Sequence, residues 1–383
     1  MFTEAQEVES QKHQPHAIMR LQTGEKEDDG AAGDDGETYQ ARLFVADEEM
    51  AAICSRVIAR ARLGEPKPMN IPGVDNSVSS IWAPDDQDKE NKFFICNWTS
   101  HGPVNSQNEY KPAFTHQSYC YFKVLTSSHF DMILCPPNCP IEFYNKGAIQ
   151  PYISMDTYAN YVSSGARCTD RNVGVDGKYF YFIGNSHDLH RVDMSVYLKS
   201  EKIHEKVADF YHRRKSSDSR TNEMVILQSN GTLLINESSV DLQDEALKKE
   251  NPVFHTIREL PHFLVVSGVK KKEKNSSQLI FLRLYDSSNY FFRDELLPPV
   301  DESNQVYQTI LPVYARKVPL LICSRYFKVV DLVGLHTRKK RLTLIEAKKV
   351  CNGEILCWYA LNPNELLFGV DSSTGLMSIS LEF

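Results

Sequence analysis

The residues in this sequence that could act together chemically are short runs of lysine and arginine. Clustered cations raise the local positive potential, which attracts acidic peptides, phosphates or RNA. Lysine runs also keep loops solvated, and acids such as Asp244, Glu250 and Glu346 dilute some of these runs. We take the following residues as candidate partner-binding loops: Lys248 and Lys249; Lys270, Lys271, Lys272 and Lys274; Lys348 and Lys349; Arg213, Arg214 and Lys215; and Arg338, Lys339, Lys340 and Arg341.

Patterns for metal binding are incomplete. Cys135 and Cys139 have near-ligand spacing, and Cys120 and His129 lie upstream of them. Zinc takes four such ligands in a tetrahedron, and no second tight pair completes the set. A Pro-rich hairpin turn accounts better for the two cysteines and the residues between them, so we predict no metal site.

Signatures of common enzymes are missing from the sequence. It has no Gly-rich phosphate loop, no G-x-S-x-G and no H-E-x-x-H. An enzyme could still build a site from scattered loops, with His101, His116, His187 and His190 as candidates. A histidine in a strand-connecting loop more often faces solvent or makes a local hydrogen bond. We therefore predict that the chain is not an enzyme, with no catalytic residues and no cofactor.

Cysteine usage and apolar run length indicate the compartment. Nine cysteines are scattered without a disulfide framework, which favours reduced thiols, and we expect most, including Cys351 and Cys357, to be buried. The sequence begins with acids and amides rather than with the charged and apolar regions of a secretory signal. Its apolar runs fall far short of the roughly 18 residues that span a bilayer. These features predict a cytoplasmic or nuclear protein without a membrane segment.

Net charge is concentrated at the N-terminus. Residues 1–38 hold ten acidic and three basic residues, which accounts for the whole formal charge of −7. The remaining chain has 40 acidic and 40 basic residues and is formally neutral. The segment is also poor in large apolar residues, so burial cannot offset the entropy of ordering it. We predict that residues 1–38 form a disordered acidic tail.

A repeat of strand-like segments organises the rest of the chain. The spacing of these segments ranges from 38 to 57 residues, with a mean of about 45, near the roughly 40–45 residues of a four-stranded propeller blade. Each segment continues through a turn into a second extended run, and Asn230-Gly231 is the clearest hairpin signal. The segments begin near Phe93, Asp131, Tyr179, Glu223, His262, Pro319 and Glu365.

Further extended segments complete each repeat to four strands. Upstream runs such as Val253 to Ile257 would be inner strands, and downstream runs such as Arg341 to Glu346 would be outer strands. Seven such units close into a ring, which removes exposed sheet edges. The last unit ends with its third strand at Phe383, and we expect Gln40 to Val45 to supply the fourth.

The sequence thus predicts an all-β fold, a single seven-bladed β-propeller over residues 78–383. Residues 39–77 would hold the closing strand and one short helix, because Met50, Ile53, Val57 and Ile58 have helical spacing and Gly64 follows them. Six or eight blades also fit the uneven spacing. Two β-sandwiches are the alternative for an irregular all-β sequence of this length.

By unit length, strand pattern and hairpin turns, residues 78–383 resemble the WD-repeat superfamily. The family's Gly-His dipeptide and closing Trp-Asp are missing, since none of Trp82, Trp98 and Trp358 precedes an aspartate. The resemblance therefore implies a propeller fold and a habit of binding other macromolecules, and it identifies no particular member.

The leading functional prediction is a non-catalytic interaction scaffold or adaptor, a monomeric ring within a larger complex. Its partners would be other proteins, including acidic or phosphorylated peptide segments. An RNA- or phosphate-binding propeller is the alternative, although aromatic residues do not interleave with the basic runs. Propeller connectivity places the clusters at 248–249, 270–274 and 348–349 on one face and those at 213–215 and 338–341 on the other. We expect the acidic tail to lie across a basic face and to compete with an acidic partner.

Overall fold

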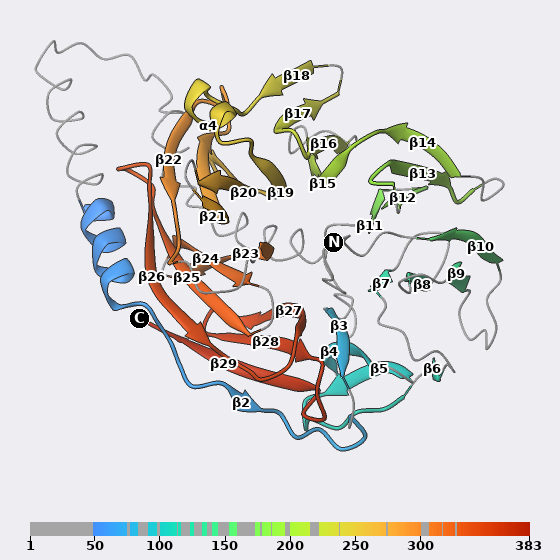
Figure 1. The fold of residues 1–383 in the computed structure, drawn as a ribbon. Coiled ribbons are helices and arrows are strands. Elements are labelled where there is room, and N and C mark those ends of the chain that lie inside the picture. Colours follow the sequence, from blue (N-terminus) through green and yellow to red (C-terminus); the bar gives the residue numbers. More distant parts are fainter. Residues whose placement is uncertain are drawn as a thin grey trace, which may run out of the picture.

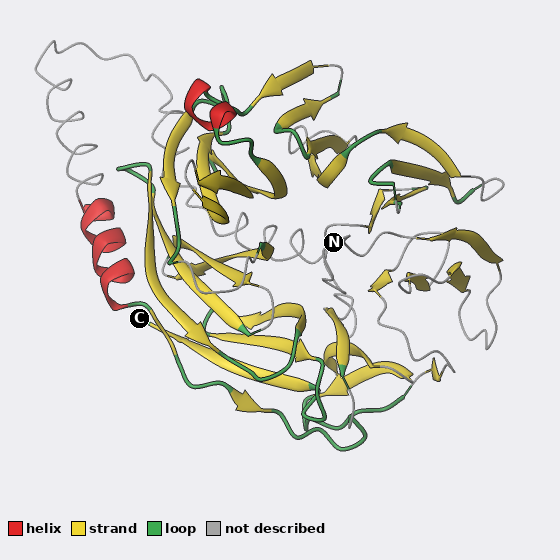
Figure 2. Ribbon diagram, viewed as in Figure 1, coloured by secondary structure: helices red, strands yellow, loops and turns green. Residues whose placement is uncertain are grey.

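Seven separate antiparallel sheets are arranged in a ring as the blades of a β-propeller (Figure 1). Figure 2 shows that strands dominate the described chain. The predicted all-β propeller fold is therefore confirmed. The computed structural model describes residues 49–74, 77–82, 91–97, 100–112, 114–115, 123–125, 132–135, 140–144, 153–158, 173–176, 178–184, 186–195, 200–214, 222–236, 238–272, 275–299, 306–315, 317–325 and 328–383. The predicted acidic tail, residues 1–38, lies outside these ranges.

The first three blades each consist of four strands that follow one another in the sequence, from the ring axis outward. They are β3 (Val78–Trp82), β4 (Asn91–Asn97), β5 (Ser100–Asn105) and β6 (Phe114–Thr115); β7 (Lys123–Leu125), β8 (Met132–Cys135), β9 (Pro140–Tyr144) and β10 (Ile153–Tyr158); and β11 (Val173–Asp176), β12 (Tyr179–Ile183), β13 (Leu189–Asp193) and β14 (Ser200–His204).

Blades four to seven are formed by strands in the same order. They are β15 (Val207–Arg214), β16 (Asn222–Gln228), β17 (Thr232–Ile235) and β18 (Ser238–Asp241); β19 (Val253–Leu260), β20 (Phe263–Lys272), β21 (Asn275–Asp286) and β22 (Phe292–Leu296); β23 (Tyr307–Ala315), β24 (Val318–Arg325), β25 (Val329–His336) and β26 (Arg341–Lys349); and β27 (Ile355–Asn362), β28 (Glu365–Val370) and β29 (Leu376–Glu382).

The seven segments predicted from the repeat are the second strands of the seven blades, from β4 to β28. These strands lie between their neighbours in the sheet and are apolar for that reason: every residue of β24 is buried. The Asn230-Gly231 turn joins β16 to β17 as predicted, and Gly231 has a φ of +84°, a conformation that favours glycine.

The ring is closed by residues at both ends of the described chain. β1 (Arg62–Leu63) and β2 (Lys67–Pro68) both pair with β29, so the last blade has its outer edge covered. We predicted Gln40 to Val45 for this role, and that position was wrong. Residues 40–45 lie outside the described residues, and the edge of β29 from Met377 to Glu382 is already taken.

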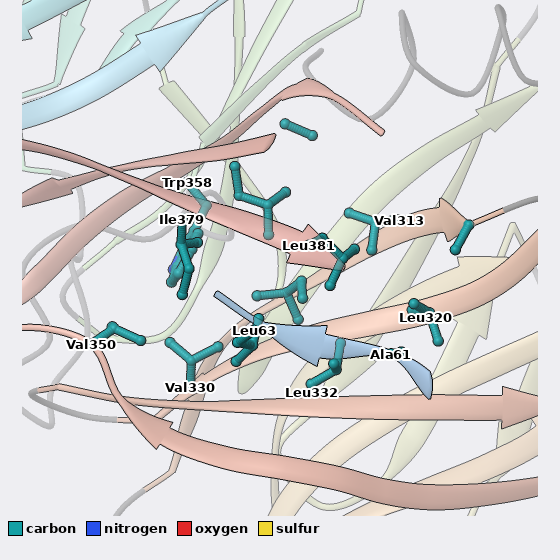
Figure 3. Packing of buried hydrophobic residues seen from close by; sticks show 14 of the residues in the cluster. Ala61, Leu63, Val313, Leu320, Val330, Leu332, Val350, Trp358, Ile379 and Leu381 are labelled. Carbon is teal, nitrogen blue, oxygen red and sulfur yellow. The ribbon is translucent and has the colours of Figure 1, made fainter. Parts of the chain in front are cut away.

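Apolar packing and a close backbone approach fix the closing strand. Leu63 is buried among residues of the last two blades, including Leu332 and Leu381 (Figure 3). The next residue, Gly64, donates its N–H to the Ser380 carbonyl at 2.9 Å. A Cβ at Gly64 would lie only 1.9 Å from Ser380 Oγ, so glycine permits this contact.

The seam between the last and first blades is joined by polar contacts as well. Ser77 Oγ donates to Asp371 Oδ1 at 2.8 Å, next to the start of β3. The Cys357 thiol on β27 lies 3.7 Å from the Val78 carbonyl oxygen. These contacts and the β29 pairing close the ring in the way that seven units require.

A helix over residues 49–60 packs against the outside of the sixth blade, as its apolar spacing predicted. Ile58 covers Gly334, and Cys54 Sγ lies 3.7 Å from the Leu335 carbonyl oxygen. Ser55 Oγ forms a 2.9 Å hydrogen bond with His336 Nε2. A second helix that we did not predict, α4 (Glu245–Lys249), lies in the connection from β18 to β19.

Candidate partner-binding surfaces

The described residues of the basic clusters lie at the ends of strands and in connections on two opposite sides of the ring. We call one side of the ring the Phe291 face. It carries the loops that join the first strand of each blade to the second and the third strand to the fourth. The Lys271 face is the opposite side, with the loops from second to third strands and those between blades. Lys271 N–H donates to the Glu250 carbonyl on one side, and Lys340 pairs with Asp286 of the fifth blade on the other.

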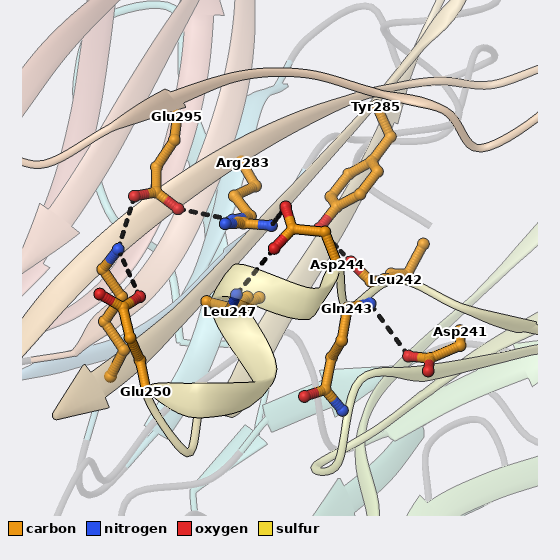
Figure 4. Close-up of polar contacts among 10 residues, drawn as sticks. Asp241, Leu242, Gln243, Asp244, Leu247, Glu250, Arg283, Tyr285 and Glu295 are labelled. Carbon is orange, nitrogen blue, oxygen red and sulfur yellow. Dashed lines mark hydrogen bonds and ion pairs between the residues drawn. The ribbon is translucent and has the colours of Figure 1, made fainter.

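On the Lys271 face, one of the predicted cations is buried rather than exposed. Lys270 is 6% exposed, and its Nζ lies 2.8 Å from Glu250 and 2.7 Å from Glu295 (Figure 4). Burial alone would lower the pKa of Lys270, but its hydrogen bonds to the two carboxylates outweigh this effect and raise the pKa. This lysine therefore stabilises the fifth blade and is not available to a partner.

A shared network extends from Lys270 through the same blade. Arg283 donates to Glu295 at 2.5 Å and to Asp244 at 2.9 Å (Figure 4). Asp244 is also the N-cap of α4, where it accepts from the Leu247 N–H at 2.7 Å. The network thus ties the blade-to-blade connection to strands β21 and β22.

Two other cations on the Lys271 face are engaged by carboxylates. Lys248 pairs with Asp241 at 3.2 Å and with Glu245 at 3.3 Å. Lys348 pairs with Glu65 at 2.6 Å and donates to the backbone carbonyls of residues 63 and 64, so it helps to hold the closing strand.

The other predicted basic residues of the Lys271 face are either exposed or outside the described residues. Lys249, Lys271 and Lys349 are exposed and make no ion pair with any residue in the described ranges. The side chain of Lys272 and the whole of Lys274 lie outside the described residues.

On the Phe291 face, Arg213 is paired with two carboxylates. Arg213 lies 2.6 Å from Glu223 and 3.1 Å from Glu259, which also accepts from the Tyr211 hydroxyl at 2.8 Å. Burial alone would lower the pKa of Arg213, but its interactions with Glu223 and Glu259 outweigh this effect and raise the pKa above its ordinary value. The Arg214 side chain and Lys215 lie outside the described residues.

The turn between β25 and β26 has three exposed basic side chains. Arg338, Lys339 and Arg341 are exposed, while Lys340 lies 3.4 Å from Asp286 of the fifth blade. Lys339 makes no ion pair with another described residue. Lys339 therefore provides a positive charge that carboxylates of the described residues do not pair with.

An exposed aromatic side chain lies beside this basic turn, and our sequence reasoning missed it. Phe291 is 63% exposed, the highest value among the large apolar side chains in the described ranges. The next strand, β22, begins at Phe292. Phe291 lies in the turn from β21, and the Arg293 guanidinium carbon is 5.1 Å from the centre of its ring.

Asp286 connects the Phe291 turn to neighbouring side chains. Its carboxylate accepts from Ser288 Oγ at 2.6 Å, from the Ser288 N–H at 3.1 Å and from Arg293 at 2.9 Å. Together with Lys340, these donors hold the pKa of Asp286 well below its ordinary value, the Ser288 hydroxyl being the largest cause. The turn is thus fastened to the neighbouring blade and presents Phe291 to solvent.

The predicted cysteine and histidine arrangements have mostly structural explanations. The hairpin expected around Cys135 is confirmed, since β8 and β9 pair across it. Cys351 is half-buried, not fully buried as expected, and burial raises its pKa to about 11. His190 stacks on Phe182 with ring centres 5.0 Å apart.

Among the remaining candidates, His187 lies in a turn with a φ of 61°. The side chain of His101 and the whole of His116, together with residues 136–139, lie outside the described residues. The described residues contain no group of three or more potential metal ligands. Nor do they contain a helix long and apolar enough to cross a membrane.

Comparisons with known proteins agree with the propeller architecture. No family model matches the chain, and no curated protein matches it in sequence. One similar solved structure is a chain of an S. cerevisiae complex of Dbp5, Nup159, Gle1, IP6 and ADP, with a TM-score of 0.52, 7% identity, and coverage of 85% of this chain and 95% of that chain. Another is U3-55K, with a TM-score of 0.50, 11% identity, and coverage of 84% and 98%.

These similarities show the fold and nothing finer, because the sequence identities are so low. The ring of seven blades and the two similar structures show that the chain folds as a β-propeller. The resemblance inferred from unit length and hairpin pattern is confirmed at this architectural level.

Proposed function

We propose that this propeller is a non-catalytic protein-interaction scaffold that belongs to a larger complex in the cytosol or nucleus. The observation that carries the proposal is the rigid exposed Phe291 beside the basic turn at residues 338–341. Binding interfaces are typically anchored by a few aromatic and arginine side chains, and a preorganised anchor loses little entropy on binding.

The chemistry of this surface defines its partner. We name as the Phe291 surface the side chains of Met50, Phe291, Arg293, Arg338 and Lys339. An apolar side chain of the partner would pack on Phe291, while carboxylates or phosphates next to it would pair with Arg338 and Lys339. The expected partner is thus an acidic or phosphorylated peptide segment with at least one large apolar residue.

An RNA- or phosphate-binding propeller remains the alternative function. Single-stranded RNA is held by several aromatic side chains interleaved with basic ones, and the Phe291 surface has one exposed aromatic ring. On the opposite face, Lys248, Lys270 and Lys348 pair with carboxylates, which reduces the positive potential available to a phosphate backbone.

Affinity purification of the tagged full chain, with and without nuclease, tests the proposal. A scaffold should retain stable partners after nuclease treatment, and Phe291→Ala or R338E with K339E should lose them at least fivefold. Val253→Ala and K249E with K271E are matched controls on the Lys271 face, because these side chains are also exposed. Loss of all partners on nuclease treatment would support RNA binding, and equal losses in both sets of variants would contradict the assigned surface.

A further inference from the structure

We propose that residues 28–48 of the chain itself bind the Phe291 surface and compete there with an external partner. This inference rests on the proposed function, because it concerns the same surface and names the segment of the chain that binds there when no partner is present. It also assigns the acidic N-terminal segment to one of the two basic faces.

The helix over residues 49–60 directs the chain toward the basic turn. Its contacts run from Ile58 on Gly334, through Cys54 at Leu335, to Ser55 at His336. The helix therefore lies along β25 with its beginning toward the turn at residues 337–340, and Figure 1 shows the blue helix beside the sixth blade. Met50 precedes Cys54 by one turn, or about 6 Å along the axis, and is 46% exposed.

The Phe291 turn lies on the other side of the same basic turn. Asp286 connects them, since its carboxylate binds both Arg293 and Lys340. Two of the four exposed large apolar side chains in the described ranges, Met50 and Phe291, thus flank one cationic turn. Such a combination offers apolar contact and charge pairing to one short segment.

Residues 28–48 have the complementary composition. They hold seven carboxylates against one base, Arg42, and an apolar stretch at Leu43-Phe44-Val45 follows most of these acids. We had expected this stretch to close the ring, but residues 62–68 take that place. The stretch therefore has no assigned role in the propeller, and its apolar side chains match the surface formed by Met50 and Phe291.

The covalent connection makes this contact local. Residues 39–48 join the helix directly and can span up to about 33 Å when extended. A short flexible tether raises the effective concentration of a segment to the millimolar range, so even weak contacts would be populated. An external acidic partner must displace the segment, which lowers the apparent affinity of that partner.

A photocrosslinking experiment on the full chain tests this inference. Phe291 is replaced by p-benzoylphenylalanine, the monomer is irradiated, and tryptic peptides are mapped by mass spectrometry. Val253 carries the same probe as a matched control, since it is 42% exposed and lies on the Lys271 face. We expect the Phe291 probe to react with the peptide of residues 27–42 or with residues 43–45, at least fivefold more often than the Val253 probe. Reaction with Met50, which belongs to the described helix, does not count.

Charge variants provide the second readout. R338E with K339E, or 1 M salt, should reduce the N-terminal cross-link severalfold, since the Debye length falls to about 3 Å at 1 M. K249E with K271E should leave it unchanged. Equal labelling from both probe positions, labelling only between two copies, or no N-terminal cross-link would overturn the inference.

The outcome is independent of the partner test. If the N-terminal cross-link is absent and Phe291→Ala still releases partners, the inference fails and the scaffold function stands. If the cross-link forms and Phe291→Ala retains every partner, the inference stands and the proposed partner surface fails.

Discussion

Leu63 lies opposite Leu381 in the sheet that closes the ring, so a residue near the start of the propeller is paired with one near its end. This pairing covers the outer edge of the last blade and joins distant parts of the sequence. Because a closed sheet array leaves no exposed edge at this seam, the contact stabilises the whole ring.

Leu63→Ala should therefore destabilise the protein by about 2–5 kcal/mol, the usual range for removing a well-packed leucine from a core. Urea unfolding followed by far-UV circular dichroism measures the loss. Lys67→Ala is the control, because Lys67 is on the same closing segment but is exposed. Equal midpoints for the wild type and Leu63→Ala would show that the seam does not contribute to global stability.

Docking of the N-terminal helix depends on the lack of a side chain at Gly334. A Cβ there would lie 2.8 Å from Ile58 Cγ1, so Gly334→Ala should loosen the helix and accelerate amide exchange over residues 49–60. In an Ile58→Ala background the same substitution should cost less, because the opposing side chain is smaller. Additive effects in this double-mutant cycle would contradict direct contact between the two positions.

The sequence predicted the parts of the fold that have a local signal. The second strands are continuous apolar runs, Asn230-Gly231 specifies a tight turn, and the helix shows its period through Ile53 and Val57. The closing strands lack such a signal. Two pairs of residues separated by Gly64, Glu65 and Pro66 show no periodicity, and only the edge of β29 makes them strands.

The candidate site was less predictable because its charges and exposure depend on distant residues. Lys270 belongs to a lysine run whose sequence suggests exposure to solvent. Its ammonium group is instead buried and pairs with Glu250 and Glu295, which lie on two other segments of the chain. The exposure of Phe291 likewise depends on where the turn ends, since β21 and β22 shift register between Leu284 and Tyr285. Neither effect can be read from the neighbouring residues alone.

The buried network around Glu295 should be far more sensitive than the surface pairs. Glu295→Ala leaves Lys270 and Arg283 without their shared carboxylate, and breaking a buried ion pair costs about 3–5 kcal/mol. Lys248→Ala, which removes only exposed pairs, should cost less than about 1 kcal/mol. Chemical denaturation compares the two variants. Similar losses of stability would show that the network around Glu295 contributes no more than the exposed pairs do.

Two turns anchored by aspartate should respond to acid in the same direction. The pKa of Asp286 lies well below its ordinary 3.8, and hydrogen bonds from Lys178 and Ser195 lower that of Asp193 to about 2. Because folding lowers these pKa values, the stabilisation is complete above pH 3.8 and is lost as the pH falls through the folded values. NMR titration of the carboxyl carbons checks this, with ordinary midpoints at both sites as the contradicting result.

Asp286→Asn tests whether Asp286 fixes the Phe291 turn, separately from the acid sensitivity that the Asp286 and Asp193 turns share. It should weaken the contacts with Arg293 and Lys340 and broaden the conformations of Phe291, while Asp193→Asn should leave Phe291 unaffected. The side-chain resonances of Phe291 report the difference.

Removal of the acidic segment should expose the positive charge of the Phe291 surface. Deleting residues 1–38 removes five of the seven carboxylates in residues 28–48, so the affinity for a fluorescent glutamate-rich peptide should rise severalfold at low salt. The gain should shrink at 1 M salt, because screening weakens the pairing with Arg338 and Lys339. In the R338E and K339E background the deletion should have much less effect, whereas K249E and K271E should preserve the gain. An unchanged affinity and salt dependence after the deletion would show that the segment does not compete for this surface.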